Sequence, residues 1–400
     1  MSIFEKRVSF KPFEYPELYE FVDAINHSYW IHTEYSFDSD IQDFKVNLDE
    51  IEKNAVKNAM LAISQIEVNV KRFWSNLYSQ FPKPEFDALG NTFGESEVRH
   101  SRAYSHVLEL LGFNEAFDEL IENPVIQGRI DYLAKYLKNA GSNNKELYTL
   151  TLALFSLFVE NCSLFSQFFI IKSFNKQKNT FKGIDNVIQA TMKEEKLHAM
   201  AGAYIINLIR KENPDWFNEE FYKTIERACK KAYAAEEKII DWIFELGELS
   251  FLSKEIVLEF TKNRFNESLK MIDAKPIFEI DKELLKESDW FNIEVDSETH
   301  TDFFHRILVA HALPDNYLLD DPRWGLSGPP LGSPVQICVI SRVWSRVLQP
   351  AATPDLHRPL HTTPPQHPAI SVSVWLTPSP ARRPAAAGRG SSFDHQHKVA

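Results

Sequence analysis

Two copies of a Glu-x-x-His motif constrain the fold of this chain more than any other feature. Glu97 and His100 make up the first copy, and Glu195 and His198 make up the second. Residues three apart on a helix project from one face, so the carboxylate and the imidazole of each copy can bind the same metal ion. A single motif is weak evidence, because a solvated Glu beside a capping or core His has the same spacing. Two copies predict one pair for each of two ions.

Each motif is preceded by a lone glutamate in an apolar helical stretch. Glu67 comes thirty residues before the first motif, and Glu160 comes thirty-five residues before the second. One Glu from each of two helices and a Glu-x-x-His from each of the other two form the ligand set of a carboxylate-bridged dimetal site. The repeated order therefore predicts a dimetal-carboxylate helical bundle.

The composition predicts a globular protein in a reducing compartment. The 400 residues are 44% hydrophobic and include thirty Phe, enough for a thick apolar interior. The three cysteines show no paired spacing, which predicts neither a disulfide framework nor a zinc site. The first residues lack the apolar core of a signal peptide, so we expect a cytoplasmic protein. The net charge of −12 argues against non-specific nucleic-acid binding.

Hydrophobic periodicity predicts helices up to about residue 300, with no strand-period stretch of any length. A long helix over residues 47–74 starts with an Asn or Asp cap, and a later helix that carries the first motif ends at Gly112. Residues 41–46 are expected to form a loop. The other predicted helices cover residues 16–29, 124–139, 145–174, 184–211, 217–246 and 253–272.

One of these helices is apolar enough to resemble a membrane span. The stretch 150–171 carries Glu160 at its centre, where a carboxylate would be costly in lipid. We therefore predict a helix that is buried within the bundle and does not enter a membrane, with Glu160 held ionised by a metal.

Two further residues lie one helical turn from the predicted ligands. Lys71 follows Glu67, and its ammonium could donate a hydrogen bond to that carboxylate or extend to solvent. Tyr104 follows His100 at roughly 6 Å along the helix axis. Tyr104 could be a redox partner of the metals, or a buried core tyrosine whose hydroxyl bonds a ligand carboxylate.

The composition changes after about Arg306. The last 94 residues hold fourteen of the twenty-one prolines and no Glu, and Arg outnumbers Lys by seven to one. We expect a helical body over residues 1–305 and a disordered tail over 306–400, because the tail has no periodicity to support a core. The shift is typical of a frameshift, vector read-through or misassembled gene, and the alternative is a genuine partner-binding tail.

The motifs resemble those of one family, the small (beta) subunit of class I ribonucleotide reductase. The resemblance covers roughly residues 10–305 and rests on the run from Ser96 to Tyr104 and on Glu194-Glu-Lys-Leu-His198. It implies an all-α, ferritin-like bundle with extra helices that generates the oxidant for deoxyribonucleotide synthesis. It also implies a homodimer that is active only with a large (alpha) subunit, as ribonucleoside-diphosphate reductase subunit beta.

The resemblance also implies roles for individual residues. Trp30 is similar to the family's relay tryptophan, Glu194 to its relay carboxylate, and Tyr104 to the tyrosine that holds the radical in many members. One ion would be bound by Glu67, Glu97 and His100, and the other by Glu160, Glu195 and His198.

This sequence departs from the family pattern at several positions. Glu67 and Glu194 stand where Asp is usual. Glu67 followed by Lys71 resembles the subclass that uses two manganese ions activated by superoxide, in which Tyr104 would stay unmodified. Two iron ions or a mixed Mn/Fe pair, with dioxygen as activator, are the alternatives. Nothing after Arg306 resembles the family's acidic tail with its relay tyrosine.

Two other functions remain open at this point. A ferritin-type storage bundle would leave Trp30 and the extra helices without a purpose. A dimetal oxidase acting on a hydrocarbon would have a substrate tunnel or a bound fatty acid.

Overall fold

The computed structural model describes residues 2–116, 120 and 122–297 of the chain. Within these residues the ordered elements are helical, and the bridge between Leu249 and Leu252 is isolated. This confirms the predicted all-α fold. The predicted boundary near residue 305 and the tail 306–400 lie outside the described residues.

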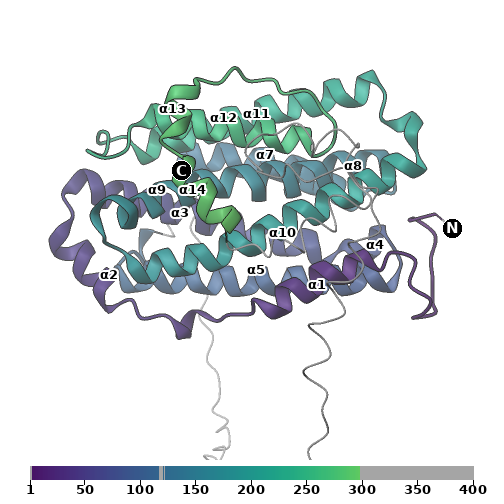
Figure 1. The fold of residues 1–400 in the computed structure, drawn as a ribbon, viewed down its shortest axis with the longest axis horizontal. Helices are drawn as coiled ribbons and strands as arrows, with labels where there is room; N and C mark the ends of the chain where they lie inside the picture. The colour runs from purple at the N-terminus through teal and green to yellow at the C-terminus, as the bar shows by residue number, and fades with distance from the viewer. Residues whose placement is uncertain (1, 117–119, 121, 298–400) are drawn as a thin grey trace, which may run out of the picture. The chain divides into compact units, whose positions relative to one another are not determined.

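The helices follow one another along the chain with short connections (Figure 1). The α-helices are α1 (Glu17–His27), α2 (Asp38–Gln42), α3 (Glu50–Ser75), α4 (Leu77–Gln80), α5 (Pro84–Leu110), α7 (Pro124–Ala140), α8 (Lys145–Leu152), α9 (Leu164–Lys178), α10 (Lys182–Glu212), α11 (Glu219–Ile243), α12 (Lys254–Lys270), α13 (Lys282–Lys286) and α14 (Asp289–Ser297). The short helices α2 and α4 and the last two helices were not predicted from the sequence.

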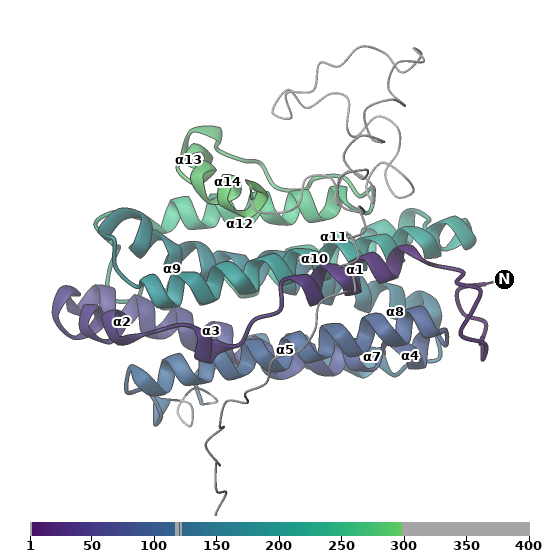
Figure 2. The ribbon, with the colours of Figure 1, turned by 60° about the horizontal axis from the view of Figure 1, so that its bottom comes forward.

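Four long helical runs form the core of the bundle. Helix α3 packs along α5, and α10 packs against the run that continues from α8 into α9. Figures 1 and 2 show α1 lying over α5, and α11 and α12 lying beyond the core helices. Large apolar side chains fill the space between these runs, including Trp74, Phe93, Phe155 and Phe158.

The predicted start of the helix that carries Glu67 and the predicted end of the helix that carries the first motif are both present. The Asp49 carboxylate accepts a hydrogen bond from the backbone N–H of Glu52, whose own carboxylate accepts from the N–H of Asp49. This capping box satisfies two of the free donors at the start of α3. Gly112 follows α5 with a φ of 86°, a left-handed conformation that favours glycine.

The prediction of a loop over residues 41–46 is wrong, because α2 and a π-helical turn at Asp43–Asn47 cover this segment. The buried Asp40 carboxylate accepts hydrogen bonds from the N–H groups of Gly183 and Ile184, at 3.0 and 2.7 Å. The segment therefore caps the free N–H groups at the start of α10. These partners are far apart in sequence, so local pattern could not reveal them.

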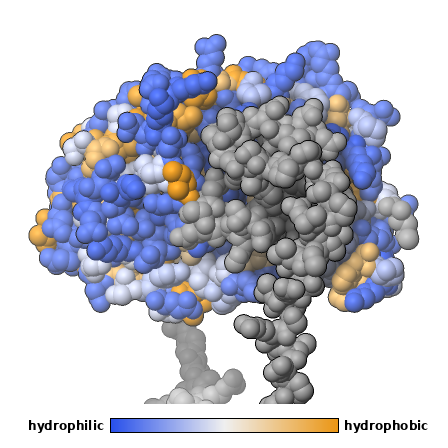
Figure 3. Space-filling model, viewed as in Figure 1, coloured by the Kyte–Doolittle hydropathy of each residue, from blue (hydrophilic) through white to orange (hydrophobic). Residues whose placement is uncertain are grey.

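The apolar run Lys145–Lys178 is long and apolar enough to cross a membrane, with a mean hydropathy of 1.6 over its most apolar window. That window is entirely buried inside the protein, which confirms the predicted buried helix. Figure 3 shows hydrophilic side chains over most of the described surface on one face. The run is not regular, however, because Ala153–Ser163 is a π-helical segment that carries Glu160. Such segments are often found at functional sites.

The N-terminal segment is tied to α5 by one buried carboxylate. Glu85 accepts hydrogen bonds from the Arg7 guanidinium at 2.5 Å and from the N–H of Glu14 at 2.7 Å. Burial would raise the pKa of Glu85, but Arg7 and the backbone N–H groups lower it overall.

Candidate metal centre

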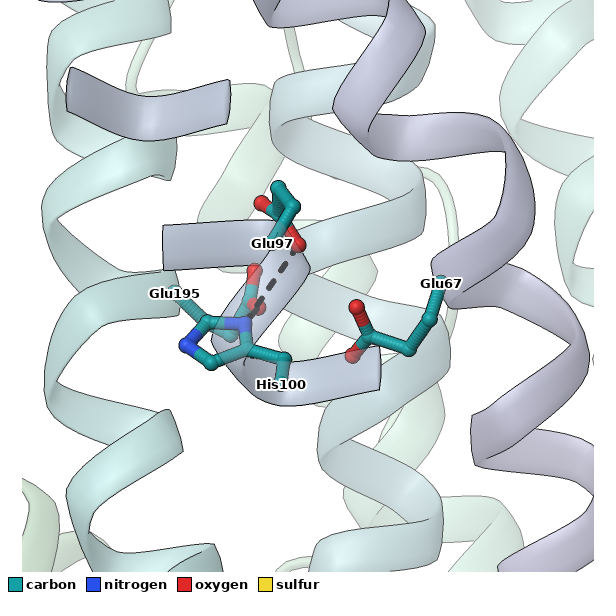
Figure 4. A group of neighbouring side chains, drawn as sticks. All are labelled: Glu67, Glu97, His100 and Glu195. Atoms are coloured by element: carbon teal, nitrogen blue, oxygen red, sulfur yellow. Dashed lines mark ion pairs between the residues drawn. The ribbon is translucent and has the colours of Figure 1, made fainter. Parts of the chain in front are cut away.

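The four core runs bring all six predicted ligands into one buried site. Glu67 comes from α3, Glu160 comes from the π-helical segment, and the two Glu-x-x-His pairs come from α5 and α10. None of the six side chains is exposed to solvent. Figure 4 shows Glu67, Glu97, His100 and Glu195 converging on one point between the helices.

The ligand atoms form two overlapping groups, each with atoms within 4.8 Å of one another. Glu97 and Glu195 belong to both groups, with Glu67 and His100 completing one and Glu160 and His198 the other. The His100 Nδ1 atom lies 3.3 Å from Glu97 Oε2 and 3.0 Å from Glu195 Oε1. The His198 Nδ1 atom lies 2.9 Å from Glu97 Oε1 and 3.5 Å from Glu195 Oε2. Glu97 and Glu195 thus each present one oxygen to each histidine, so either carboxylate could contribute to both ions.

The polar atoms at the centre fit two cations. Both oxygens of Glu67, Glu97 and Glu195, Glu160 Oε2 and both histidine Nδ1 atoms are buried without a hydrogen-bond partner among the described residues. Buried polar atoms are rarely left unsatisfied, so their convergence indicates a site that fits metal ions. Four carboxylates carry a charge of −4, which two divalent ions would neutralise.

Each imidazole is oriented by a hydrogen bond at its outer nitrogen. The Nε2 atom of His100 lies 2.7 Å from Glu194 Oε2, and that of His198 lies 3.0 Å from Ser96 Oγ. With the proton held at Nε2, the lone pair of Nδ1 faces the carboxylates and can bind a metal. The histidines are therefore set in the tautomer that a ligand needs.

Burial makes the negative charge of the ligand carboxylates unfavourable unless a cation compensates it. Burial, followed by the charge of Glu97, raises the pKa of Glu67 well above its usual value, and burial does the same for Glu160. Burial disfavours a charged His198, yet Glu97 and Glu195 raise its pKa to about 10. Metals and protons therefore compete for the same atoms, and metal binding releases protons.

Trp74 is a site residue that the sequence analysis missed. Its indole N–H donates a 2.5 Å hydrogen bond to Glu160 Oε1, and its ring packs 5.7 Å from the His198 ring, centroid to centroid. Phe93 packs against the same imidazole at 4.2 Å. Trp74 lies seven residues after Glu67, two turns along the same face of α3. This spacing could have indicated from the sequence that Trp74 lies near the site.

Trp30 and Glu194 both contact the ligand His100, but they do not hydrogen-bond each other. The Trp30 ring stacks on the imidazole with centroids 5.9 Å apart and planes at 15°. The indole N–H of Trp30 has no hydrogen-bond partner among the described residues. Both oxygens of Glu194 instead accept from Arg99, at 3.0 and 3.2 Å, in addition to the contact with His100.

The sequence left open whether Tyr104 and Lys71 contact ligand carboxylates, and in the structure these contacts do not form. Tyr104 is fully buried, and burial and the charge of Glu67 raise its pKa well above the usual value, but its hydroxyl does not bond a ligand carboxylate. The Lys71 ammonium lies 3.5 Å from the Ser101 hydroxyl, and the side chain is half-buried. Reaching Glu67 would strip that ammonium of its remaining water, which is costly.

A helical bundle with two overlapping carboxylate and histidine groups defines a ferritin-like dimetal-carboxylate protein. The family model for "Ribonucleotide reductase, small chain" matches residues 7–284. The chain belongs to this family, which confirms the prediction of a class I small subunit and of its function. Membership of this family implies a large-subunit partner and the usual dimer.

Viral relatives match most of the chain. It is 25% identical to the probable ribonucleoside-diphosphate reductase small subunit of Invertebrate iridescent virus 6 over 349 residues, covering 78% of this chain and 96% of that one. The corresponding protein of Invertebrate iridescent virus 3 is 23% identical over 327 residues, covering 78% and 86%.

Solved structures share the fold. The ribonucleotide reductase R2 subunit from Clostridium botulinum has a TM-score of 0.65 at 19% identity, covering 70% of this chain and 89% of that one. An R2-like ligand-binding oxidase with a reconstituted Mn/Fe cofactor has a TM-score of 0.57 at 18% identity, covering 66% and 95%. At these identities the likeness shows the fold alone.

Proposed function

We propose that this chain generates and stores a metal-based oxidant on the six-residue site and passes it to a large subunit, where ribonucleotides are reduced. The observation that carries the proposal is the convergence of unpartnered carboxylate oxygens and Nδ1 atoms from four helices in a site without solvent exposure. Family membership supports it over the storage and hydrocarbon-oxidase alternatives.

We assign six metal ligands, with Glu97 and Glu195 shared between the ions: Glu67, Glu97, His100, Glu160, Glu195 and His198. Two manganese ions are the proposed cofactor, with two iron ions or a mixed pair as alternatives, because oxygen and imidazole ligands accept both metals. When bound, such ions supply the one-electron oxidising chemistry. Trp74 and Phe93 pack against the ligand His198 and keep water out of the site.

Trp30 is the proposed residue through which an electron reaches the oxidant. Its indole is the oxidisable ring that stacks on a ligand imidazole, and it is 3% exposed. In this scheme Trp30 gives one electron to the oxidant, while Glu194 keeps the proton of His100 at Nε2. His100 would then keep its Nδ1 lone pair directed at the metal site while the electron moves.

Tyr104 and Lys71 have supporting roles in the proposal. Tyr104 stays an unmodified, protonated phenol beside a metal-centred oxidant, as its raised pKa supports. Lys71 lies at Ser101 rather than at Glu67, so it attracts superoxide to the site by its charge and not by direct contact with the ligand. Dioxygen is the alternative activator.

The proposed setting is a cytoplasmic homodimer that docks on the alpha subunit. No contact with nucleic acid or membrane is proposed, in line with the net charge of −12 and the burial of the apolar run. The oxidant would be made in the small subunit and used only when the large subunit is bound.

Elemental analysis and electron paramagnetic resonance of the activated protein test the proposal. Mixed-valent dimanganese hyperfine structure is expected, and a tyrosyl doublet that disappears in Tyr104→Phe would refute a metal-centred oxidant. Because Glu97 faces both histidines, Glu97→Ala should lose both ions, whereas Glu67→Ala should retain the ion held by Glu160 and His198. Full metal content in both variants would refute the ligand assignment.

A further inference from the structure

Arg99 connects the metal site to the protein surface. It precedes His100 on α5, is 5% exposed, and donates from its guanidinium to both oxygens of Glu194. The same group donates to the backbone carbonyl of Trp30 at 3.3 Å. Its central carbon lies 4.6 Å from the ring centroid of Tyr29 and 5.6 Å from that of Trp30. One cation therefore contacts two neighbouring oxidisable rings.

These contacts occupy Glu194. The carboxylate accepts from Arg99 through both oxygens and from His100 through one of them, whereas the Trp30 indole N–H has no hydrogen-bond partner among the described residues. A guanidinium paired in this bidentate way is held firmly. Glu194 is thus not in contact with the Trp30 proton, and Trp30 can exchange its electron while keeping that proton.

Tyr29 differs from the other aromatic neighbour of Trp30 in its access to water. Tyr29 is 55% exposed, and the guanidinium of Arg99 holds its ring at cation–π distance. Tyr35 also packs edge-on against Trp30, with centroids 5.8 Å apart, but it has no such contact with Arg99 in the described structure and is half-buried. A phenol loses its proton when it is oxidised, and the phenol of Tyr29 has water at hand to accept it.

We propose that Tyr29 is the surface end of the electron path and that Arg99 is the residue that positions it. The proposal rests on the proposed function of Trp30. Trp30 gives one electron to the oxidant and becomes a radical cation. Tyr29 then gives one electron to Trp30 and its phenolic O–H proton to water, which restores Trp30 and leaves a neutral Tyr29 radical. The reaction in the large subunit returns one electron and one proton to Tyr29.

The test uses the full chain, loaded with metal and activated, in a Tyr104→Phe background so that Tyr104 cannot contribute a phenoxyl signal. Ascorbate serves as the one-electron reductant, and stopped-flow absorbance follows the loss of the oxidant. Tyr29→Phe keeps the ring beside Arg99 but removes the O–H group, and should slow this loss at least tenfold. Tyr35→Phe is the matched control and should stay within twofold of the parent.

Freeze-quench electron paramagnetic resonance gives a second readout. The parent should pass through a phenoxyl signal that narrows with ring-deuterated tyrosine, and Tyr29→Phe should show a tryptophan radical in its place. A Tyr29→Phe protein with the parent's rate and signal would overturn the proposal, as would loss of both in Tyr35→Phe. Metal content and oxidant yield are measured first. If the parent forms no oxidant, the proposed function fails; if it does and Tyr29→Phe has no effect, only this inference fails.

Arg99 is tested through its effect on Tyr29. Arg99→Met removes the guanidinium that contacts the rings of Tyr29 and Trp30, and should leave the radical on Trp30 instead of Tyr29. Arg99→Lys keeps a positive charge and should restore part of the phenoxyl signal. Arg102→Met, three residues later on the exposed side of α5, is the control and should match the parent. An Arg99→Met protein with the parent's phenoxyl signal would refute the positioning role. If Arg99→Met fails to load metal, the Lys variant and Tyr29→Phe decide.

Discussion

The hydrogen bond from Trp74 to Glu160 predicts that the affinity for the ion held by Glu160 and His198 depends on Trp74, which is not itself a ligand. The Trp74 N–H donates to Glu160 Oε1 at 2.5 Å, and Glu160 Oε2 is unpartnered and lies 3.9 Å from His198 Nδ1. Oε2 is therefore the atom available to a metal. Trp74→Phe removes the N–H donor and leaves Oε1 buried without a partner.

The size of the effect follows from the type of bond. A hydrogen bond to a charged group contributes about 1.5–3 kcal/mol, and about 1.4 kcal/mol changes an equilibrium constant tenfold. The ion held by Glu160 and His198 should therefore bind about 10- to 150-fold more weakly in Trp74→Phe, in line with the loss of other partners of metal ligands. The ion held by Glu67 and His100 should change much less, because the hydrogen bond and the ring contact of Trp74 are with Glu160 and His198.

The assay is a titration of metal-free protein with Mn(II) against a competing chelator, with the two ions resolved by electron paramagnetic resonance. The ratio of the two affinities is the quantity of interest, since a general loss of packing around Trp74 would lower both together. Trp216→Phe serves as the control, because Trp216 packs against Phe4 in the N-terminal segment and takes no part in the site. Urea unfolding of the metal-free proteins measures the packing loss separately.

Two outcomes would refute the reasoning. If the ion held by Glu160 and His198 binds to Trp74→Phe with an affinity within about threefold of the parent, the indole N–H does not orient Glu160 for metal binding. Equal weakening of both ions would assign the effect to packing and not to the hydrogen bond.

Three other changes have defined outcomes. Gly202→Ala would place a Cβ 2.1 Å from Ser156 Oγ and should cost about 1–3 kcal/mol in urea unfolding, whereas Gly128→Ala meets nothing within 4 Å and should stabilise α7 by about 0.5–1 kcal/mol. Glu85 has a lowered pKa, so its stabilising charge is present above its ordinary value of 4.5 and lost as pH falls through the lowered folded value. Glu85→Gln should therefore be less stable than the parent at pH 7, and the deficit should disappear in unfolding curves taken at falling pH. A chain that ends at residue 305 should keep the stability and metal content of the full chain, because the tail composition supports no core; a lower value of either would contradict the proposed boundary.

The fold class and the types of the ligand residues could be predicted from the sequence alone. Both follow from local rules: a spacing of three places Glu97 and His100 on one helical face, and apolar periodicity indicates where helices run. The Asn or Asp cap of the helix that carries Glu67 was predictable for the same reason, since Asp49 and its partner Glu52 lie within one turn. The family motifs extended this to the identity of a class I small subunit, which the family match confirms.

How the ligands and their neighbours contact one another depends on the packing of the helices. Which carboxylates face both histidines depends on how α5 and α10 pack, so Glu97 and Glu195 could not be recognised as shared between the ions from spacing. The same holds for Arg99, whose partner Glu194 is ninety-five residues away, and for Lys71, which meets Ser101 on another helix. The π-helical segment around Glu160 was hidden too, because apolar residues on every side give no periodicity from which its extra residue per turn could be detected. Contacts within a helical turn are set by the geometry of the chain, whereas contacts between helices are set by the packing of the whole core.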